Sequence, residues 1–327
     1  MTRKARVLVT GGTGFIGRHV VSRLSSRGHA VRVLVRGVTE LARGVEAFHG
    51  DLERPAELAP GLEGVDHVVH AAALLDPIHD ADAADRVNRF ATEQLFDAAA
   101  RAGCRSFVFL SSQAAVGFHP GGGLVAPDAE CRPTTIYGRS KRDAERALLA
   151  RSATGPRLVV LRPPTVYGPG ERRNFLALTR AVDSGFFVVP GSGANRMSMC
   201  WVGNLADACL WALDADAARG IVHVADEPVL SFREIVETLG WALGRPPLPV
   251  PFPQPLAWAV AFGAELAFGA LHRDPPLGRA RLQTLTADCA LDTRATRRLG
   301  FVPGTRFTEG VARTVAWYRD EGLVRAR

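Results

Sequence analysis

Cysteine is scarce in this chain of 327 residues, and its few cysteines are scattered. There are five, an odd number, and no two of them form the CxxC pair found in many zinc sites and redox-active disulfides. The spacing therefore predicts neither a disulfide framework nor a metal site, and it favours a reducing compartment, which we expect to be the cytoplasm. The five are Cys104, Cys131, Cys200, Cys209 and Cys289.

Long hydrophobic runs are also missing. The first apolar run begins after Arg6 and stops at Gly11, too early for a signal-peptide core, so we interpret it as a first strand. The most apolar segment, from Pro255 to Leu271, has about 17 residues and contains Glu265, which is short of the roughly 20 that span a membrane. We expect a helix of a smaller lobe there. Contact with a membrane surface or with another copy of the chain stays an alternative.

No block of like charges stands out, although the formal net charge is +7. The arginines are dispersed and are not interleaved with aromatic residues, which favours an ordinary solvated surface over a nucleic-acid partner. A positive field also attracts small anions. We therefore expect a small-molecule ligand and no nucleic acid.

The first half of the chain alternates short β-branched runs with longer helical patterns, without internal repeats. This alternation predicts an α/β fold, a Rossmann-type doubly wound parallel sheet whose strands are buried on both faces. We expect helices from Phe15 to Arg27 and from Ala84 to Arg101, each followed by a glycine stop. The predicted buried strands are Arg6 to Thr10, Ala30 to Val35, Val45 to Gly50, Asp66 to Ala72, Ser106 to Ser112, Arg157 to Pro163 and Ile221 to Asp226.

After Tyr167 the pattern becomes less regular and richer in proline and glycine, which indicates a second lobe. We assign residues 1–165, together with about 197–226, to the sheet domain. Residues 166–196 and 227–327 then form a smaller, partly interleaved C-terminal substrate lobe.

A glycine-rich turn follows the first predicted strand. The stretch TGGTGFIG, from Thr10 to Gly17, places small residues where a strand meets a helix, which is the context of a dinucleotide-binding turn. Free amides at the helix start can hold a diphosphate, and the absence of a Walker lysine argues against a nucleoside triphosphatase. The residues expected to line this site are Gly11, Thr13, Gly14, Phe15, Ile16 and Gly17.

Arg36 directly follows the second predicted strand, at the position where an acidic residue would bind an adenosine ribose 2′-hydroxyl. An arginine there favours NADP(H) and leaves NAD(H) possible. Asp51, followed by Leu52, closes the third strand, and its carboxylate either meets the adenine ring or caps the next turn.

Tyr137 and Lys141 in the stretch YGRSK are four residues apart, so a helix places both on one face. A nearby ammonium favours phenolate, so we expect Lys141, together with the positive nicotinamide ring of an oxidised cofactor, to lower the pKa of the phenol. We also expect Lys141 to hold the nicotinamide ribose. Ser111 and Ser112 end the fifth strand, at the sheet edge where such folds bind ligands. We favour Ser112 as the donor to a reacting oxygen; capping of the strand end is the alternative for both hydroxyls.

Together these blocks resemble an extended short-chain dehydrogenase/reductase, within the NAD-dependent epimerase/dehydratase and 3β-hydroxysteroid dehydrogenase superfamily. The blocks are TGxxGxxG, HAAA at His70 to Ala73, Asn88, the serine pair, YxxxK, and LRPPTVYGPG at Leu161 to Gly170. The resemblance extends over nearly the whole chain.

The resemblance implies further site residues. Besides Tyr137 and Lys141, it assigns cofactor contacts to Ala71, Ala72, Ala73, Asn88, Ser111, Pro163 and Val166. It assigns substrate contacts to Gln113, Tyr167, Asn174 and Arg196, although Asn174 and Arg196 have a purely structural alternative as ties between loops. It also implies a homodimer whose contact is made by the helices near Ala84 to Arg101 and Tyr137 to Arg151.

The blocks are less specific for the reaction. Gln113 and Ala114 stand where related dehydratases carry an acid pair, so we set dehydration aside. We predict an oxidoreductase, a ketone reductase or secondary alcohol dehydrogenase that acts on a hydrophobic steroid-like, polyketide-like or β-keto compound. Gly117 and Phe118, where sugar-nucleotide enzymes usually have Tyr-Gly, and the apolar segment around Trp258 and Phe262 favour this reading.

Two alternatives stay open. An NDP-sugar 4-epimerase needs only the same serine, tyrosine and lysine. A non-catalytic NAD(P)-sensing regulator on the same fold is the second, but such proteins tend to lack the tyrosine and lysine that this chain keeps.

Overall fold

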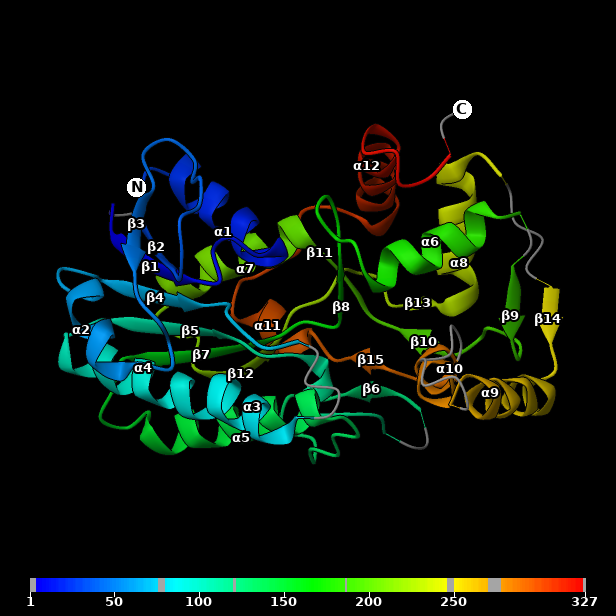
Figure 1. Cartoon of the computed structure of the whole chain (residues 1–327), viewed down its shortest axis with the longest axis horizontal. Helices are drawn as coiled ribbons and strands as arrows, with labels where there is room; N and C mark the ends of the chain where they lie inside the picture. The colour runs from blue at the N-terminus through cyan, green and yellow to red at the C-terminus, as the bar shows by residue number, and fades with distance from the viewer. Residues whose placement is uncertain are drawn as a thin grey trace.

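The computed structural model describes residues 4–75, 80–119, 122–185, 187–245, 250–269 and 278–325. Two lobes lie side by side, a larger one built on a sheet and a smaller one of helices and short strands (Figure 1). The N-terminus lies in the sheet lobe and the C-terminus in the smaller lobe.

Seven strands of the larger lobe form one parallel sheet in the order β12-β7-β5-β4-β1-β2-β3. The order reverses between β1 and β4, which makes the sheet doubly wound and confirms the predicted α/β fold. The strands are β1 (Arg6–Thr10), β2 (Ala30–Val35), β3 (Glu46–His49), β4 (His67–His70), β5 (Ser106–Leu110), β7 (Arg157–Arg162) and β12 (Gly220–His223).

Helices cover both faces of this sheet (Figure 1). Side chains alternate along β1, so that Val7 and Val9 pack toward α1 (Phe15–Ser26) and α7 (Val202–Asp214). Leu8 packs on the other face, toward α2 (Leu58–Gly61), α4 (Ala91–Arg101) and α5 (Ile136–Arg151). Burial on both faces explains why the inner strands are continuous apolar runs.

The prediction of a buried third strand is wrong. Three of the four residues of β3 are exposed and only Phe48 is partly buried. This strand is the edge of the sheet, with β2 as its one neighbour, so the helices cover it less than the inner strands.

The helix predicted from Ala84 to Arg101 has three parts. A short α3 (Ala81–Ala84) passes into a π-helical turn, η2 (Asp85–Phe90), and then into α4. The predicted glycine stops are confirmed, since Gly28 and Gly103 follow their helices with φ of 82° and 74°.

The smaller lobe surrounds a second hydrophobic core, which includes Tyr167, Phe175, Trp201, Phe232 and Phe307. Its strands form two-stranded pieces: β8 (Thr165–Tyr167) with β11 (Met199–Trp201), β9 (Val188–Pro190) with β14 (Val250–Phe252), β10 (Arg196–Met197) with β13 (Leu230–Ser231), and β6 (Leu124–Val125) with β15 (Ala290–Leu291). The remaining helices are α6 (Asn174–Asp183), α8 (Phe232–Leu243), α9 (Gln254–Gly269), α10 (Arg279–Thr286), α11 (Arg294–Arg298), α12 (Phe307–Asp320) and the 3-10 turns η1 (Pro55–Glu57) and η3 (Gln113–Ala115).

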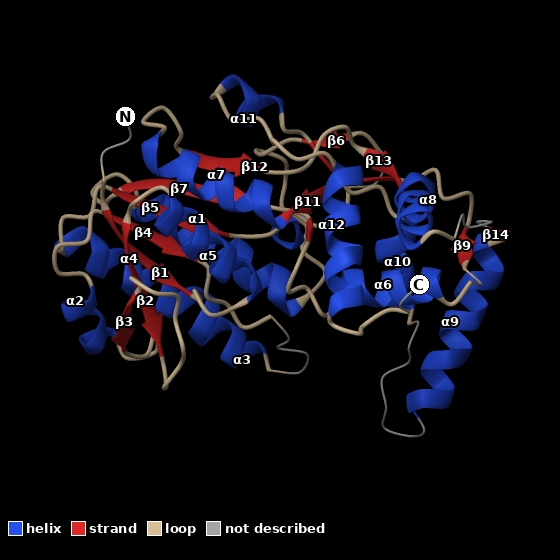
Figure 2. Cartoon of the chain, turned by 90° about the horizontal axis from the view of Figure 1, so that it is seen from above, coloured by secondary structure: helices blue, strands red, loops and turns tan. Residues whose placement is uncertain are grey.

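The apolar segment after Pro255 forms α9, as predicted, up to Gly269; residues 270 and 271 lie outside the described ranges. In both views α9 lies at the end of the smaller lobe that is remote from the sheet (Figures 1 and 2). Its position does not support the use of Trp258 and Phe262 as evidence for a hydrophobic substrate, and Phe262 is exposed. Within the described ranges, none of the helices has the length and hydropathy to span a membrane.

Candidate active site

The glycine-rich turn is packed so closely that side chains are excluded. Gly11 has φ of 66°, and a Cβ there would lie 2.7 Å from the backbone nitrogen of Ala72. A Cβ at Gly17 would lie 2.0 Å from the carbonyl oxygen of Gly11. Glycine is therefore required for β1, the turn and α1 to come together at the end of β4.

The start of α1 is open to an anion. Its N-cap is Gly14, no side chain caps the helix, and its first turn carries no acidic residue. The first amides of a helix need partners, and here no side chain supplies one. The turn from Thr13 through Phe15 and Ile16 therefore fits a dinucleotide diphosphate.

The adenosine end of the expected site is only partly formed by side chains. Arg36 is exposed just after β2. The carboxylate of Asp51 accepts a hydrogen bond from the Glu53 amide at 3.0 Å, so of the two alternatives the structure shows the cap. Leu52 is partly buried against the sheet core.

Three alanines follow β4 beside the glycine turn. The amide of Ala71 donates to the carbonyl of Thr10 at 3.2 Å, and that of Ala72 donates to the Thr10 hydroxyl at 3.3 Å. Ala73 is partly buried like its neighbours. The segment thus continues from β4 along the glycine turn.

Ser112, Tyr137 and Lys141 meet at the carboxyl end of β5. The Ser112 hydroxyl accepts from the amide of Ala114 at 3.1 Å and caps η3, while Thr135 caps α5 just before Tyr137. Burial raises the pKa of Tyr137 to about 12, and a hydrogen bond with the Ser112 side chain opposes this rise. The phenol and the serine hydroxyl are thus neighbours.

Lys141 is almost fully buried, with 1 % of its surface exposed. Its Nζ donates to the carbonyl oxygen of Leu110 at 2.8 Å and lies 4.5 Å from the Phe109 ring centre and 6.0 Å from that of Tyr137. Burial lowers the pKa of Lys141 to about 7, and the charge of Glu145 opposes this shift.

The downward shift predicted for the pKa of Tyr137 depends on an oxidised nicotinamide ring as well as on Lys141, and the structure shows the chain without cofactor. Burial dominates and raises the pKa of the phenol. The lysine Nζ is directed to a backbone carbonyl at the end of β5. In this state Tyr137 is a protonated acid at neutral pH.

Asn88 supports the start of α5. Its amide bonds both backbone groups of Leu74, at 2.7 and 3.0 Å, and donates to the Ser140 hydroxyl at 3.0 Å. Ser140 in turn donates to the carbonyl of Tyr137 at 2.9 Å. The described contacts of Asn88 are therefore with the protein scaffold next to the tyrosine.

Sequence reasoning missed the carboxylate of Glu145. It accepts a hydrogen bond from Ser111 and two from Arg162, at 2.8 and 2.5 Å. The hydroxyl of Ser111 is thus committed to Glu145, so any contact of Ser111 with a cofactor falls to its backbone. The signal was available, because Glu145 follows Lys141 by four residues on a helix.

The residues predicted to bind substrate do not gather in one place. The side chain of Tyr167 has no exposed surface, and its hydroxyl donates to Asp226 at 2.8 Å in the core of the smaller lobe. The assignment of the Tyr167 side chain to the substrate is therefore wrong. Gln113 joins the two lobes, because its amide donates to the carbonyl of Cys289 at 2.8 Å.

The other two lie on the surface of the smaller lobe. Asn174 is exposed at the first turn of α6. The guanidinium of Arg196 donates to the carbonyl of Val229 at 3.2 Å, which is the structural alternative foreseen for it. Pro163 is buried, and its carbonyl oxygen accepts a hydrogen bond from the backbone amide of Gln113 at 2.8 Å. Val166 packs against the sheet core.

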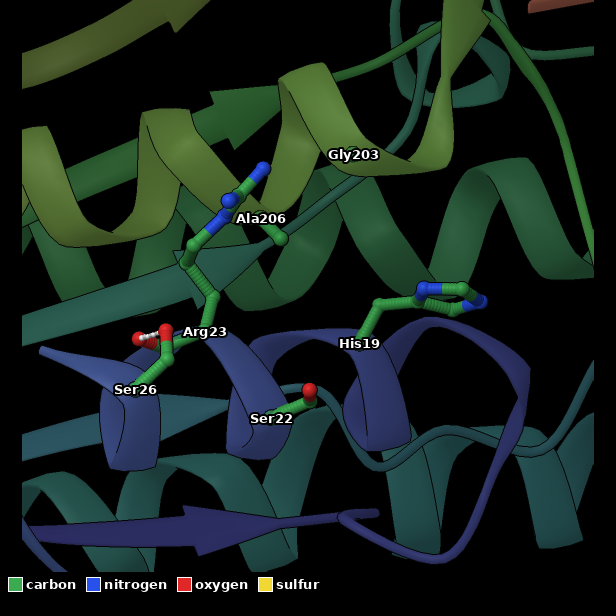
Figure 3. A pocket seen from close by; sticks show the side chains of 6 residues that line it. All are labelled: His19, Ser22, Arg23, Ser26, Gly203 and Ala206. Atoms are coloured by element: carbon green, nitrogen blue, oxygen red, sulfur yellow. Dashed lines mark hydrogen bonds between the residues drawn. The ribbon is translucent and has the colours of Figure 1, made fainter.

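A small cavity lies between α1 and α7 (Figure 3). Side chains of α1 line one wall, including His19, which bonds the carbonyl of Pro169 at 2.7 Å, and Arg23, which pairs with Asp207 at 2.8 Å. Gly203 and Ala206 of α7 form the other wall. None of the predicted site residues lines this cavity.

Comparison with known proteins identifies the family. The family model for the NAD dependent epimerase/dehydratase family matches residues 7–225. The chain belongs to this family.

Two relatives of the epimerase/dehydratase family illustrate its range. A UDP-glucose 4-epimerase of Vibrio cholerae is 30% identical to this chain, over 94% of both chains. A 3 beta-hydroxysteroid dehydrogenase/Delta 5-->4-isomerase of Mycobacterium tuberculosis is 31% identical, over 73% of this chain and 70% of its own. These matches identify the chain as an extended short-chain dehydrogenase/reductase.

The fold match to the epimerase/dehydratase family covers both lobes. The structure of MoeE5 in complex with UDP-glucuronic acid and NAD has a TM-score of 0.76 and 26% identity, over 97% of this chain and 99% of that one. This chain is therefore an NAD-dependent enzyme of the extended short-chain type.

Proposed function

We propose that this enzyme is an NADP(H)-linked ketone reductase or secondary alcohol dehydrogenase that acts on a hydrophobic substrate. The observation that carries the proposal is the meeting of Ser112, Tyr137 and Lys141 at the edge of the sheet, next to the glycine turn. A hydroxyl, a phenol and an ammonium in this arrangement supply a hydrogen bond, a proton and a positive charge.

Each side chain has a defined task in the reduction direction. Ser112 donates its hydroxyl hydrogen to the substrate carbonyl oxygen, and Tyr137 delivers the proton that this oxygen gains as it becomes an alcohol. The chemistry that NADPH would supply when bound is the hydride for the carbonyl carbon. Lys141 holds the nicotinamide ribose and stabilises the phenolate that Tyr137 leaves behind.

The protonation state of Tyr137 supports its role as an acid. Burial raises its pKa to about 12, so the phenol carries its proton throughout the neutral range. Lys141, with its pKa lowered to about 7, is close to its titration point there. A protonated Lys141 closer to Tyr137 would favour the phenolate and would so ease release of the phenolic proton.

The cofactor set proposed here is the glycine turn, Arg36, Asp51 to Leu52, Ala71 to Ala73 and Asn88, with Pro163 and Val166 near the nicotinamide. The support for NADP(H) is the exposed Arg36 at the end of β2, where a guanidinium can pair with a 2′-phosphate. We expect R36A to raise the Kd for NADPH about tenfold, equivalent to ~1.4 kcal/mol, and to leave the Kd for NADH nearly unchanged. Equal losses for both cofactors would contradict the preference.

One observation argues against dehydration as the reaction, and a second one supports a hydrophobic substrate. The serine is followed by Gln113 and Ala114, and Gln113 is committed to the backbone of Cys289, so no acid pair is present there for dehydration. The Mycobacterium tuberculosis relative is named for a hydroxysteroid, which is a hydrophobic secondary alcohol.

An NDP-sugar 4-epimerase is the second candidate. Its support is the Vibrio cholerae relative, which matches nearly the whole chain, and the likeness to MoeE5, whose structure holds UDP-glucuronic acid. Against it, the guanidinium of Arg196 is bonded to Val229 on the surface of the smaller lobe.

Cofactor consumption separates the candidates. The purified protein should oxidise NADPH in the presence of hydrophobic β-keto esters or a steroid ketone, and it should not convert UDP-glucose. Interconversion of UDP-sugars without net NADPH oxidation would replace the reductase with the epimerase. Tight cofactor binding with neither reaction would indicate a regulator.

We also propose a homodimer with its contact on α4 and α5. Phe90, next to α4, and Leu149 of α5 are exposed apolar side chains on these helices. Dimer mass by light scattering that becomes monomeric in F90E/L149E would support this contact, and an unchanged mass would reject it.

A further inference from the structure

Glu145 is a buried carboxylate beside the catalytic side chains that the proposed mechanism does not use. It follows Lys141 by four residues on α5, so both side chains lie on one face of that helix, and each has 1 % of its surface exposed. Its two oxygens accept hydrogen bonds from Ser111 on one side and from Arg162 on the other.

The pair between Glu145 and Arg162 is costly to bury. Arg162 is 1 % exposed, and its remaining hydrogen bonds go to the carbonyl of Pro127 at 3.0 Å and to the sulfur of Cys131 at 3.4 Å. Buried ion pairs often contribute little net stability compared with apolar side chains of similar size. Stability alone therefore does not account for a carboxylate next to Lys141.

The surroundings of Lys141 contain few other charges. Its Nζ donates to the carbonyl of Leu110 and lies against the ring of Phe109 on β5. His70 on β4 bonds two threonine hydroxyls, and burial lowers its pKa to about 3, so it stays neutral. The guanidinium of Arg162 on β7 pairs with Glu145, and of these two charges it is that of Glu145 that acts on the pKa of Lys141.

Ser111 connects the carboxylate to the sheet. Its hydroxyl donates to Glu145, and its amide donates to the carbonyl of Leu161 on β7 at 2.8 Å. The next residue is Ser112, which contacts Tyr137. Glu145 thus contacts the segment that carries the serine and shares a helix with the lysine.

We propose that Glu145 is a positioning residue for the reaction: its charge favours the protonated form of Lys141, and its bond to Ser111 fixes the backbone from which Ser112 projects. This inference rests on the proposed function for its effect on turnover. Its effect on Lys141 concerns the chain alone and can be measured without cofactor or substrate.

The composition makes this measurement simple, because Lys4 and Lys141 are the only two lysines in the chain. A sample labelled with ¹³C at the lysine side chain should give two Cε resonances, and K141M identifies the one that belongs to Lys141. Its titration midpoint, followed by NMR without cofactor, should fall by roughly one pH unit in E145Q. A folded E145Q with the same Lys141 midpoint as the unmodified protein would overturn the proposal.

The double variant E145Q/R162Q guards against misfolding, because it leaves no unpaired buried charge. Since the carboxylate of Glu145 is the charge that opposes the loss of the Lys141 proton, the midpoint should fall in this variant too. E93Q is the matched control, because Glu93 is a buried carboxylate on α4 that pairs with Arg151 at 2.7 Å and with Arg89 at 3.4 Å. The control should leave the Lys141 midpoint in place, and an equal shift in E93Q would show a general effect of removing charge.

Two kinetic readouts complete the test. In E145Q the high-pH limb of kcat for ketone reduction should move to lower pH together with the NMR midpoint. S111A removes the hydrogen bond from the Ser111 hydroxyl to Glu145 and keeps the charge of Glu145. It should therefore lower kcat several-fold and leave the titration midpoint of Lys141 unchanged. If the Lys141 midpoint shifted as much in S111A as in E145Q, the charge of Glu145 and its bond to Ser111 would not have the separate effects proposed here. Absence of ketone reduction in the unmodified protein, with the NMR shift still present, would reject the proposed function and leave the charge effect standing.

Discussion

The two lobes of this enzyme are organised by different kinds of contact. In the sheet lobe, β1, β2 and β3 lie side by side in chain order, as do β4 and β5. Ser112 follows β5, and Tyr137 and Lys141 lie on α5. In the smaller lobe, short strands pair with partners from distant parts of the chain, as β6 does with β15. The positions of residues in the sheet lobe are therefore easier to predict from local sequence patterns than those in the smaller lobe.

The use of tyrosine shows the same difference. The chain has three tyrosines. Tyr137 at the sheet edge has a serine hydroxyl as its neighbour, whereas Tyr167 and Tyr318 donate to the buried carboxylates of Asp226 and Glu171. We propose a reaction for the phenol in the sheet lobe, whereas the other two phenols bond carboxylates inside the smaller lobe.

The largest expected effect follows from removal of the Tyr137 hydroxyl. Y137F should lower kcat roughly 10²–10⁴-fold, because the proton donor is lost, while the Kd for NADPH stays close to its original value. Steady-state kinetics and fluorescence titration with NADPH check both parts. Retained turnover in Y137F would end the distinction between the tyrosines.

The glycine turn gives the next largest effect. G11A introduces a Cβ 2.7 Å from the backbone of Ala72 at a φ of 66°, so it should destabilise the fold by about 2–4 kcal/mol and weaken NADPH binding. G103A is the matched control, because Gly103 has a φ of 74° with nothing within 4 Å of its Cβ position. Denaturant unfolding of both variants separates the steric clash from the backbone strain, and equal losses would reject the clash.

Acid should weaken the sheet lobe in particular. Burial lowers the pKa of three histidines in its strands, His67 and His223 to about 4 and His70 to about 3. Each takes up a proton in the unfolded chain near pH 6.5 and in the folded chain only below its lowered pKa, so stability is lost as the pH falls through this window.

For His70 the loss amounts to about 2 kcal/mol at pH 5. The difference in Tm between pH 8 and pH 5 should therefore be smaller in H70Q than in the unmodified protein. An equal difference in both proteins would show that His70 is protonated more readily than its burial implies.

The smallest expected effects concern the two tyrosines of the smaller lobe. Y167F and Y318F should each cost about 1–2 kcal/mol of stability, because a buried carboxylate loses a hydrogen-bond donor. Their kcat values should stay within a factor of about two, provided that the folded fraction is taken into account. A loss of kcat in Y167F comparable to that in Y137F would restore Tyr167 to the substrate site.

Much of the sheet lobe could be predicted from sequence. The strands β1 and β2 have the predicted bounds, because an inner strand of a parallel sheet is a continuous apolar run. The glycine turn and the pair of Tyr137 and Lys141 were predictable for a related reason, since their spacing reflects one turn or one helix face. The exposure of β3 was not predictable, because an edge strand and an inner strand share the same local pattern.

The contacts that hold Tyr167 and Gln113 span long sequence separations. Tyr167 is buried against Asp226, and Gln113 is bonded to Cys289 in the opposite lobe. Neither partner can be inferred from the neighbours of these residues in the chain. The raised pKa of Tyr137 in the chain without cofactor could not be inferred for a similar reason, because desolvation depends on everything that surrounds the phenol.

The sequence by itself determined the class of fold, the glycine-rich turn between a strand and a helix, and the place of Tyr137 and Lys141 on one helix. These features depend on periodicity and on the conformational freedom of glycine, which are local properties of the chain. Only the tertiary structure decided the charge state of Tyr137 and Lys141, the place of Glu145 between Ser111 and Arg162, and the burial of Tyr167. The reason is physical, since burial and electrostatic interaction depend on distances in space that sequence separation does not fix.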